Sequence, residues 1–156
     1  MNYRRQTQEV IAMSISGITV ALYFLFLFFG SLSTSLASDA LTYLALILCA
    51  FGIVLFVLSI ITLRRRGTKE LTDQGIYGVV RHPMYLSGMF FYLAMICFLP
   101  HWIIAANAIM GMASVYWTMI LGEQRNLEKF GETYERYMQS VPRMNILAGL
   151  MRQLRR

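Results

Sequence analysis

Three long uncharged stretches constrain the fold of this chain more than any other feature of its sequence. Asp, Glu, Lys and Arg are all absent from residues 10–38, 40–63 and 82–122, which are 29, 24 and 41 residues long. A helix that crosses a membrane needs about 20 mostly apolar residues. The chain is only 14% charged, whereas a soluble domain carries about 25% charged residues. The pattern therefore excludes an ordinary soluble domain and a disordered chain.

The lengths of these stretches predict an all-α fold, in which residues 1–156 form a single membrane domain with four transmembrane helices. The first two stretches fit one span each, and the third fits two spans with a turn around Pro100. The predicted spans lie near residues 10–30, 40–63, 84–99 and 102–121. A loop over residues 64–83 and a C-terminal segment over residues 122–156 complete the domain. The third span is short, so we expect it to begin within residues 78–83 or to tilt little.

A cleaved signal peptide is the alternative interpretation of the first stretch. Arg4 and Arg5 would form its basic region, and Ser35-Leu36-Ala37 would form its cleavage site. The apolar core of a signal peptide is only about 7–15 residues long, however. Because this stretch is much longer and a second span follows at once, we expect it to be retained.

The distribution of basic residues predicts the orientation in the membrane. All 14 Lys and Arg residues lie in residues 1–5, 64–81 and 125–156, and four spans would place these segments on one side. Since basic residues concentrate on the cytoplasmic side, both termini, the loop and the C-terminal segment are predicted to be cytoplasmic. The net charge of +6 then favours contact with membrane lipids. None of the nucleic-acid-binding motifs is present, and Cys49 and Cys97 lack the spacing of a metal site.

Polar side chains gather at the start of the third predicted span. Four of them can bind a ligand: Tyr77, Arg81, His82 and Tyr85. Pro83 suits the first turn of a helix, and that turn attracts an anionic group through its free N–H groups and partial positive charge. Structural capping explains the His82-Pro83 pair equally well, so the pair alone leaves both interpretations open.

A second polar region follows the fourth predicted span. Its apolar residues recur at spacings typical of one amphipathic helix or a broken helix pair: Leu127, Phe130, Tyr134 and Tyr137. Residues 146–156 alternate leucine and arginine in the pattern of a basic amphipathic helix that lies on a membrane. Glu123 ends the longest uncharged stretch and should lie at the bilayer boundary. A carboxylate there is costly without a partner, which makes Glu123 a functional candidate.

The two polar regions contain an ordered set of motifs: Gly75-Ile76-Tyr77, Arg81-His82-Pro83-Met84-Tyr85, Glu123, Phe130-Gly131, Tyr134, Tyr137 and Val141-Pro142. This set resembles the signature of the isoprenylcysteine carboxyl methyltransferase family, a broad group that includes phospholipid N-methyltransferases and bacterial relatives. The match covers residues from about 64 to 143, and a helical hairpin separates its halves. A looser similarity exists to the C-terminal part of membrane sterol reductases, which use NADPH.

The resemblance implies a small integral-membrane enzyme that binds S-adenosylmethionine in a cytoplasmic-side pocket. By position, the cofactor contacts would fall on Lys69, Glu70, Leu71, Thr72, Tyr77, His82, Pro83, Met84, Tyr85 and Glu123. Glu123 and Arg81 are the candidate catalytic residues, and no metal is expected. Glu123 could pair with the positive or hydroxyl groups of the cofactor, while Arg81 and His82 hold its carboxylate. The tyrosine faces could attract its sulfonium group.

Two positions depart from the family pattern. Met119 stands where the carboxyl-methylating members have an arginine for the substrate carboxylate, and Lys69 replaces a histidine. A lipophilic or small methyl acceptor is expected, but a lipid amine, a thiol and a prenyl-type carboxylate all stay open, as does the oligomeric state. The expected location is the inner membrane of a prokaryote. The alternatives are an NADPH-dependent reductase of the same fold and a non-enzymatic four-helix transporter.

Overall fold

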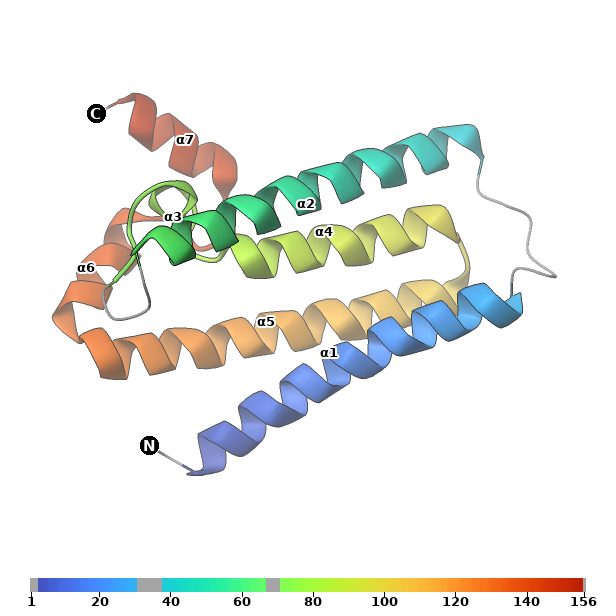
Figure 1. The fold of residues 1–156 in the computed structure, drawn as a ribbon, viewed down its shortest axis with the longest axis horizontal. Helices are drawn as coiled ribbons and strands as arrows, with labels where there is room; N and C mark the ends of the chain where they lie inside the picture. The colour runs from blue at the N-terminus through green and yellow to red at the C-terminus, as the bar shows by residue number, and fades with distance from the viewer. Residues whose placement is uncertain (1–2, 31–37, 67–70, 156) are drawn as a thin grey trace.

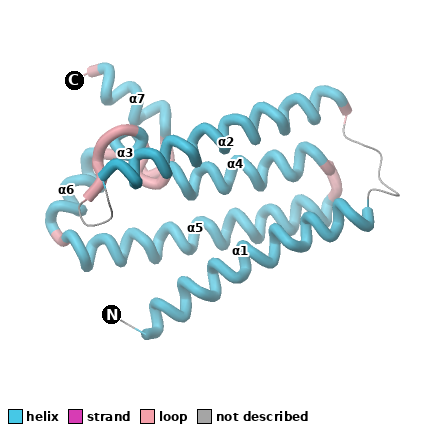
Figure 2. The backbone as a smooth tube through the Cα atoms, in the orientation of Figure 1, coloured by secondary structure: helices cyan, strands magenta, loops and turns pink. Residues whose placement is uncertain are grey.

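The computed structural model describes residues 3–30, 38–66 and 71–155, and these residues form helices joined by turns, with no strand among them (Figures 1 and 2). The helices are α1 (Tyr3–Gly30), α2 (Asp39–Arg66), α3 (Ile76–Val79), α4 (Pro83–Phe98), α5 (Trp102–Phe130), α6 (Glu132–Ser140) and α7 (Ile146–Leu154). The all-α class predicted from the sequence is therefore confirmed for these ranges.

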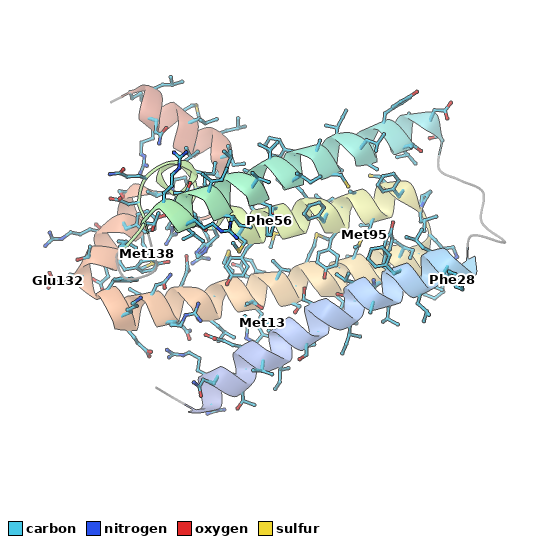
Figure 3. The ribbon with its side chains drawn as sticks, in the orientation of Figure 1. Met13, Phe28, Phe56, Met95, Glu132 and Met138 are labelled. Atoms are coloured by element: carbon cyan, nitrogen blue, oxygen red, sulfur yellow. The ribbon has the colours of Figure 1, made fainter. Side chains whose placement is uncertain are left out.

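The long helices pack as a bundle in the order α2, α4, α5 and α1. The short helices α3, α6 and α7 gather at one end of this bundle, where α2 ends, α4 begins and α5 ends (Figure 1). We call this end the polar end. Both chain termini also lie on this side in Figure 1. Figure 3 shows Glu132 and Met138 at the polar end and Phe28 at the opposite end.

Within the described residues, three helical segments are long and apolar enough to cross a membrane: Arg4–Phe28, Asp39–Arg65 and Trp102–Phe130. Helix α4 is apolar but has only 16 residues, so it is about 24 Å long, whereas a bilayer core is about 30 Å thick. The fourth span therefore stays a prediction. Helix α4 begins at Pro83, the last residue of the predicted window 78–83. The proposed cleavage motif at residues 35–37 lies outside the described residues.

The predicted end of the fourth span, residue 121, is not the end of the helix. Helix α5 continues to Phe130 and stops at Gly131, whose φ of 53° belongs to the left-handed region. Glycine adopts this conformation without steric cost, so Gly131 separates α5 from α6. Of the two alternatives for the segment after Glu123, one amphipathic helix or a broken helix pair, the structure shows the broken pair. Residues 146–154 form helix α7, as the sequence predicted.

A polar network fastens α1 to α4 and α5. The hydroxyl of Tyr92 on α4 lies 2.8 Å from Thr19 Oγ1 and 3.1 Å from Ser16 Oγ on α1. The Nδ2 group of Asn107 on α5 donates to the Thr19 carbonyl at 2.9 Å. Between apolar helices in lipid there is little hydrophobic drive, so such bonds and small residues at the contacts hold the helices together. Gly111 on α5 leaves the space that the Tyr92 ring occupies.

We expect Gly111→Ala to lower the thermal unfolding midpoint of the detergent-solubilised protein. The added Cβ would overlap the Tyr92 ring, and overpacking of this kind costs about 1–3 kcal/mol. Gly17→Ala is the matched control, because a Cβ at residue 17 meets nothing within 4 Å. Unfolding followed by circular dichroism checks this, and equal midpoints for the two variants would contradict it.

Candidate functional site

A buried carboxylate with one histidine and two arginine partners lies at the polar end. Glu123 on α5 is only 5% exposed. Its Oε1 lies 3.1 Å from Arg81 Nη1, 2.9 Å from His82 Nε2 and 3.2 Å from Arg143 Nε. Its Oε2 lies 2.7 Å from Arg143 Nη2, so Arg143 binds the carboxylate with two nitrogens. We call these four residues the Glu123 cluster.

Two hydrogen bonds to backbone carbonyls bring the segments of this cluster together. The Arg81 N–H donates to the carbonyl of Pro142 at 3.0 Å, which ties the segment before α4 to the segment after α6. The hydroxyl of Tyr137 on α6 donates to the Tyr77 carbonyl at 2.7 Å. Both contacts join residues about 60 positions apart, and they place Arg143 beside α5.

His82 is neutral in this environment. Burial lowers the pKa of His82 below its ordinary value of 6.5, and this effect outweighs the hydrogen bond to Glu123, which raises it. Arg81 and Arg143 also disfavour a further positive charge at this point. Neutral His82 can still donate to Glu123 Oε1 when its proton is on Nε2. The cluster then carries two guanidinium charges against one carboxylate.

A cavity of about 450 Å³ opens beside the cluster, between the end of α2, the start of α4, α5 and α6. Seven candidate residues from the sequence line it: Leu71, Thr72, Tyr77, Arg81, His82, Met84 and Tyr85. Further lining residues include three polar side chains from α5, Arg125, Asn126 and Lys129, and two tyrosines from α6, Tyr134 and Tyr137. The structure thus brings most of the described candidates around one space.

Other predicted residues lie elsewhere. Pro83 and Glu123 do not line the cavity, because Pro83 is buried at the start of α4 and the Glu123 carboxylate binds Arg81, His82 and Arg143. Met119 is fully buried in α5 and lies outside the lining too. Lys69 and Glu70 are outside the described residues.

The Arg81 guanidinium keeps unused binding capacity next to the cavity. Its Nε is buried and has no hydrogen-bond partner in the part of the chain that the structure describes. Its Nη1 contacts Glu123 as an ion pair without hydrogen-bond geometry. A buried donor without a partner is costly, so an anionic group at this point would be favourable. No group of three or more His, Cys, Asp or Glu residues within the described ranges could hold a metal ion.

Arg143 is the functional candidate that the sequence did not reveal. Its side chain is 41% exposed, and its Nη1 also reaches the hydroxyl of Tyr116 at 3.3 Å. Only the requirement that Glu123 have a partner pointed to such a residue. Nothing in the spacing of the segment after Pro142 singles out Arg143 as that partner.

We expect Glu123→Gln to destabilise the protein by about 3–5 kcal/mol, because removal of one partner of a buried ion pair leaves the other charge uncompensated. Glu128→Gln is the matched control on the same helix, since Glu128 is exposed and pairs with Arg5, and an exposed pair contributes about 0–1 kcal/mol. Thermal unfolding in detergent compares the two. Similar midpoints for both variants would show that Glu123 is not the centre of the cluster.

The lowered pKa of His82 predicts a loss of stability in acid. His82 has a lower pKa in the folded chain than its ordinary value of about 6.5 in the unfolded chain. Between these two values the unfolded chain binds more protons than the folded chain. The contribution of His82 to stability is therefore fully present above pH 6.5 and is lost as the pH falls from 6.5 towards the pKa of the folded chain. His82→Gln removes this contribution, and its unfolding midpoint should fall less between pH 7 and pH 5 than that of the wild type. Parallel pH profiles would contradict the assignment of neutral His82.

A comparison with protein families places these residues in a known context. Residues 40–133 match the phospholipid methyltransferase family. The match spans more than half of the chain, from α2 to the start of α6, and includes Arg81, His82 and Glu123. No curated protein and no solved structure gave a match. This match supports a methyltransferase activity for the protein. It also confirms the resemblance seen in the sequence. The chain belongs to the phospholipid methyltransferase family.

Proposed function

We propose that this protein is an integral-membrane methyltransferase that uses S-adenosylmethionine and acts on a lipophilic or small acceptor at the cytoplasmic face. The observation that carries the proposal is the cavity of about 450 Å³ at the polar end. Six of the residues that the resemblance assigns to the cofactor line it: Leu71, Thr72, Tyr77, His82, Met84 and Tyr85. The proposal includes a fourth span through α4 and a cytoplasmic polar end.

The residues around the cavity fit the chemistry of this cofactor. The volume of the cavity lies in the range of about 300–1,000 Å³ that is typical of ligand pockets. The unpartnered Nε of Arg81 suits the cofactor's carboxylate. The rings of Tyr77, Tyr85 and Tyr134 belong to the lining, and a tyrosine face attracts a cation by about 0.5–2 kcal/mol. When bound, the cofactor supplies an electrophilic methyl group on a positively charged sulfur.

The contribution of the chain is then chiefly orientation. Methyl transfer is an in-line displacement, so holding the two reactants in the right geometry lowers the barrier. Arg81 and His82 line the cavity, whereas Glu123 lies outside the lining and binds both. This arrangement favours a positioning role for Glu123, acting through Arg81 and His82. The predicted direct contact of Glu123 with the cofactor stays a prediction.

The acceptor would approach from the bilayer side of the polar end. Met119 cannot meet it, because the side chain is fully buried in α5. Arg143 is the partly exposed cation of the Glu123 cluster and contacts Tyr116 on the surface of α5. A carboxylate acceptor therefore stays among the candidates beside a lipid amine and a thiol, although residue 119 lacks the expected arginine.

Calorimetric titration of the detergent-purified protein with S-adenosylmethionine tests the proposal. We expect binding in the micromolar range, and we expect His82→Ala to weaken it about 10- to 100-fold, the effect of losing a hydrogen bond to a charged group. His101→Ala is the matched control. His101 lies at the opposite end of the bundle, where its side chain caps the start of α5 by accepting a hydrogen bond from the Ile103 N–H.

Four outcomes would count against this function. The first is folded wild-type protein that does not bind S-adenosylmethionine. The second is equal weakening by the two histidine variants. The third is thermal stabilisation by NADPH but not by S-adenosylmethionine, which would favour a reductase. Transport into proteoliposomes that depends on Glu123 would instead favour the transporter.

A further inference from the structure

Helix α7 has an apolar face that the described part of the chain leaves uncovered. Leu147 is 73% exposed and Leu154 is 87% exposed, and Leu150 and Met151 are exposed as well. Arg155 directly follows the helix and is also exposed. A short helix that combines exposed leucines with arginine has the composition of an interfacial helix.

The opposite face of α7 is packed on the segment that leads to the candidate site. The Nη2 group of Arg152 donates to the Gly78 carbonyl in α3 at 2.7 Å. Gly149 is buried, and a Cβ there would overlap the carbonyl of Val79. Helix α3 ends at Val79, two residues before Arg81. A movement of α7 would therefore displace Gly78 and Val79, which lie just before Arg81 of the Glu123 cluster.

The place of α7 in the fold matches the surface of a bilayer. Figure 1 shows α7 projecting past α2 on the side away from α1, at the level of the last turns of α2. Helix α2 is apolar enough to cross a membrane from Asp39 to Arg65, so its end marks a membrane boundary. A helix that projects sideways at this level would lie over the lipid that surrounds α2.

We propose that α7 binds the surface of a bilayer that contains anionic lipid. Leu147, Leu150 and Leu154 insert among the acyl chains, and Arg155 contacts the anionic headgroups. Charge complementarity selects this occupant, because Arg64 and Arg65 are exposed at the adjoining end of α2 and basic groups near an anionic surface are attracted to it. Docking of α7 then restrains residues 78–81 through Arg152 and Gly149. This proposal does not depend on the identity of the cofactor.

Hydrogen–deuterium exchange of the full chain in nanodiscs that hold one copy tests it. Nanodiscs of phosphatidylcholine alone are compared with nanodiscs that also contain phosphatidylglycerol. We expect residues 146–154 and 78–81 to exchange more slowly in the anionic nanodiscs, and high salt to remove the difference. Arg155→Gln should lower the anionic protection of α7 about fivefold, which corresponds to about 1 kcal/mol for one basic residue at the surface.

Arg136→Gln is the matched control, because Arg136 is an exposed arginine on α6 whose ion-pair partner is the exposed Glu132 on the same helix. It should leave the protection of α7 unchanged, whereas Leu154→Gln should lower it in both lipids. Equal exchange in the two kinds of nanodisc, or equal effects of the two arginine variants, would overturn the proposal. Protection that appears only when a nanodisc holds two copies would assign the apolar face to a second chain.

Discussion

The carboxylate of Glu123 draws three separate segments to one point in the fold. Removal of a carboxylate from water costs several kcal/mol unless cations and hydrogen bonds replace the water. Arg81 and His82 reach it from the segment before α4, and Arg143 reaches it from the segment after α6. Helix α5 carries the acid, so the cluster fixes the start of α4 and the end of α6 against α5. The cavity lies in the space between these elements, and its shape depends on the cluster.

The polar end is larger than the segment that matches the family. Arg143 lies beyond residue 133, so one of the two arginines of the cluster comes from outside the match. Helix α1 precedes the match, and it binds the last turns of α5 through Arg5–Glu128 at 2.5 Å and Glu9–Arg125 at 3.3 Å. Since Arg125 lines the cavity, the flanking helix takes part in positioning one of its walls.

The sequence predicted what charge and turn chemistry control locally. The uncharged stretches predicted the long helices, and Pro83 marked the start of α4. Glu123 was recognised as an acid that needs a partner, but its partner Arg143 depends on contacts between distant segments, such as Arg81 N–H to the Pro142 carbonyl. The sequence placed the edge of the fourth span at residue 121, because loss of apolar character marks a bilayer edge, whereas Gly131 marks the end of helix α5.

The charges around the cavity also determine which way a ligand with separated charges would lie. With His82 neutral, the Glu123 cluster has an excess of one positive charge, and Arg125 and Lys129 add to the positive lining. An anionic group would therefore lie towards Arg81. A cationic centre on the same ligand would be repelled by these charges, and the faces of the lining tyrosines attract such a centre without a carboxylate. On the proposed function, an anchor for the cofactor's carboxylate at Arg81 would limit the positions open to the methyl-bearing sulfur, and positional control of that kind is how a protein accelerates an in-line transfer.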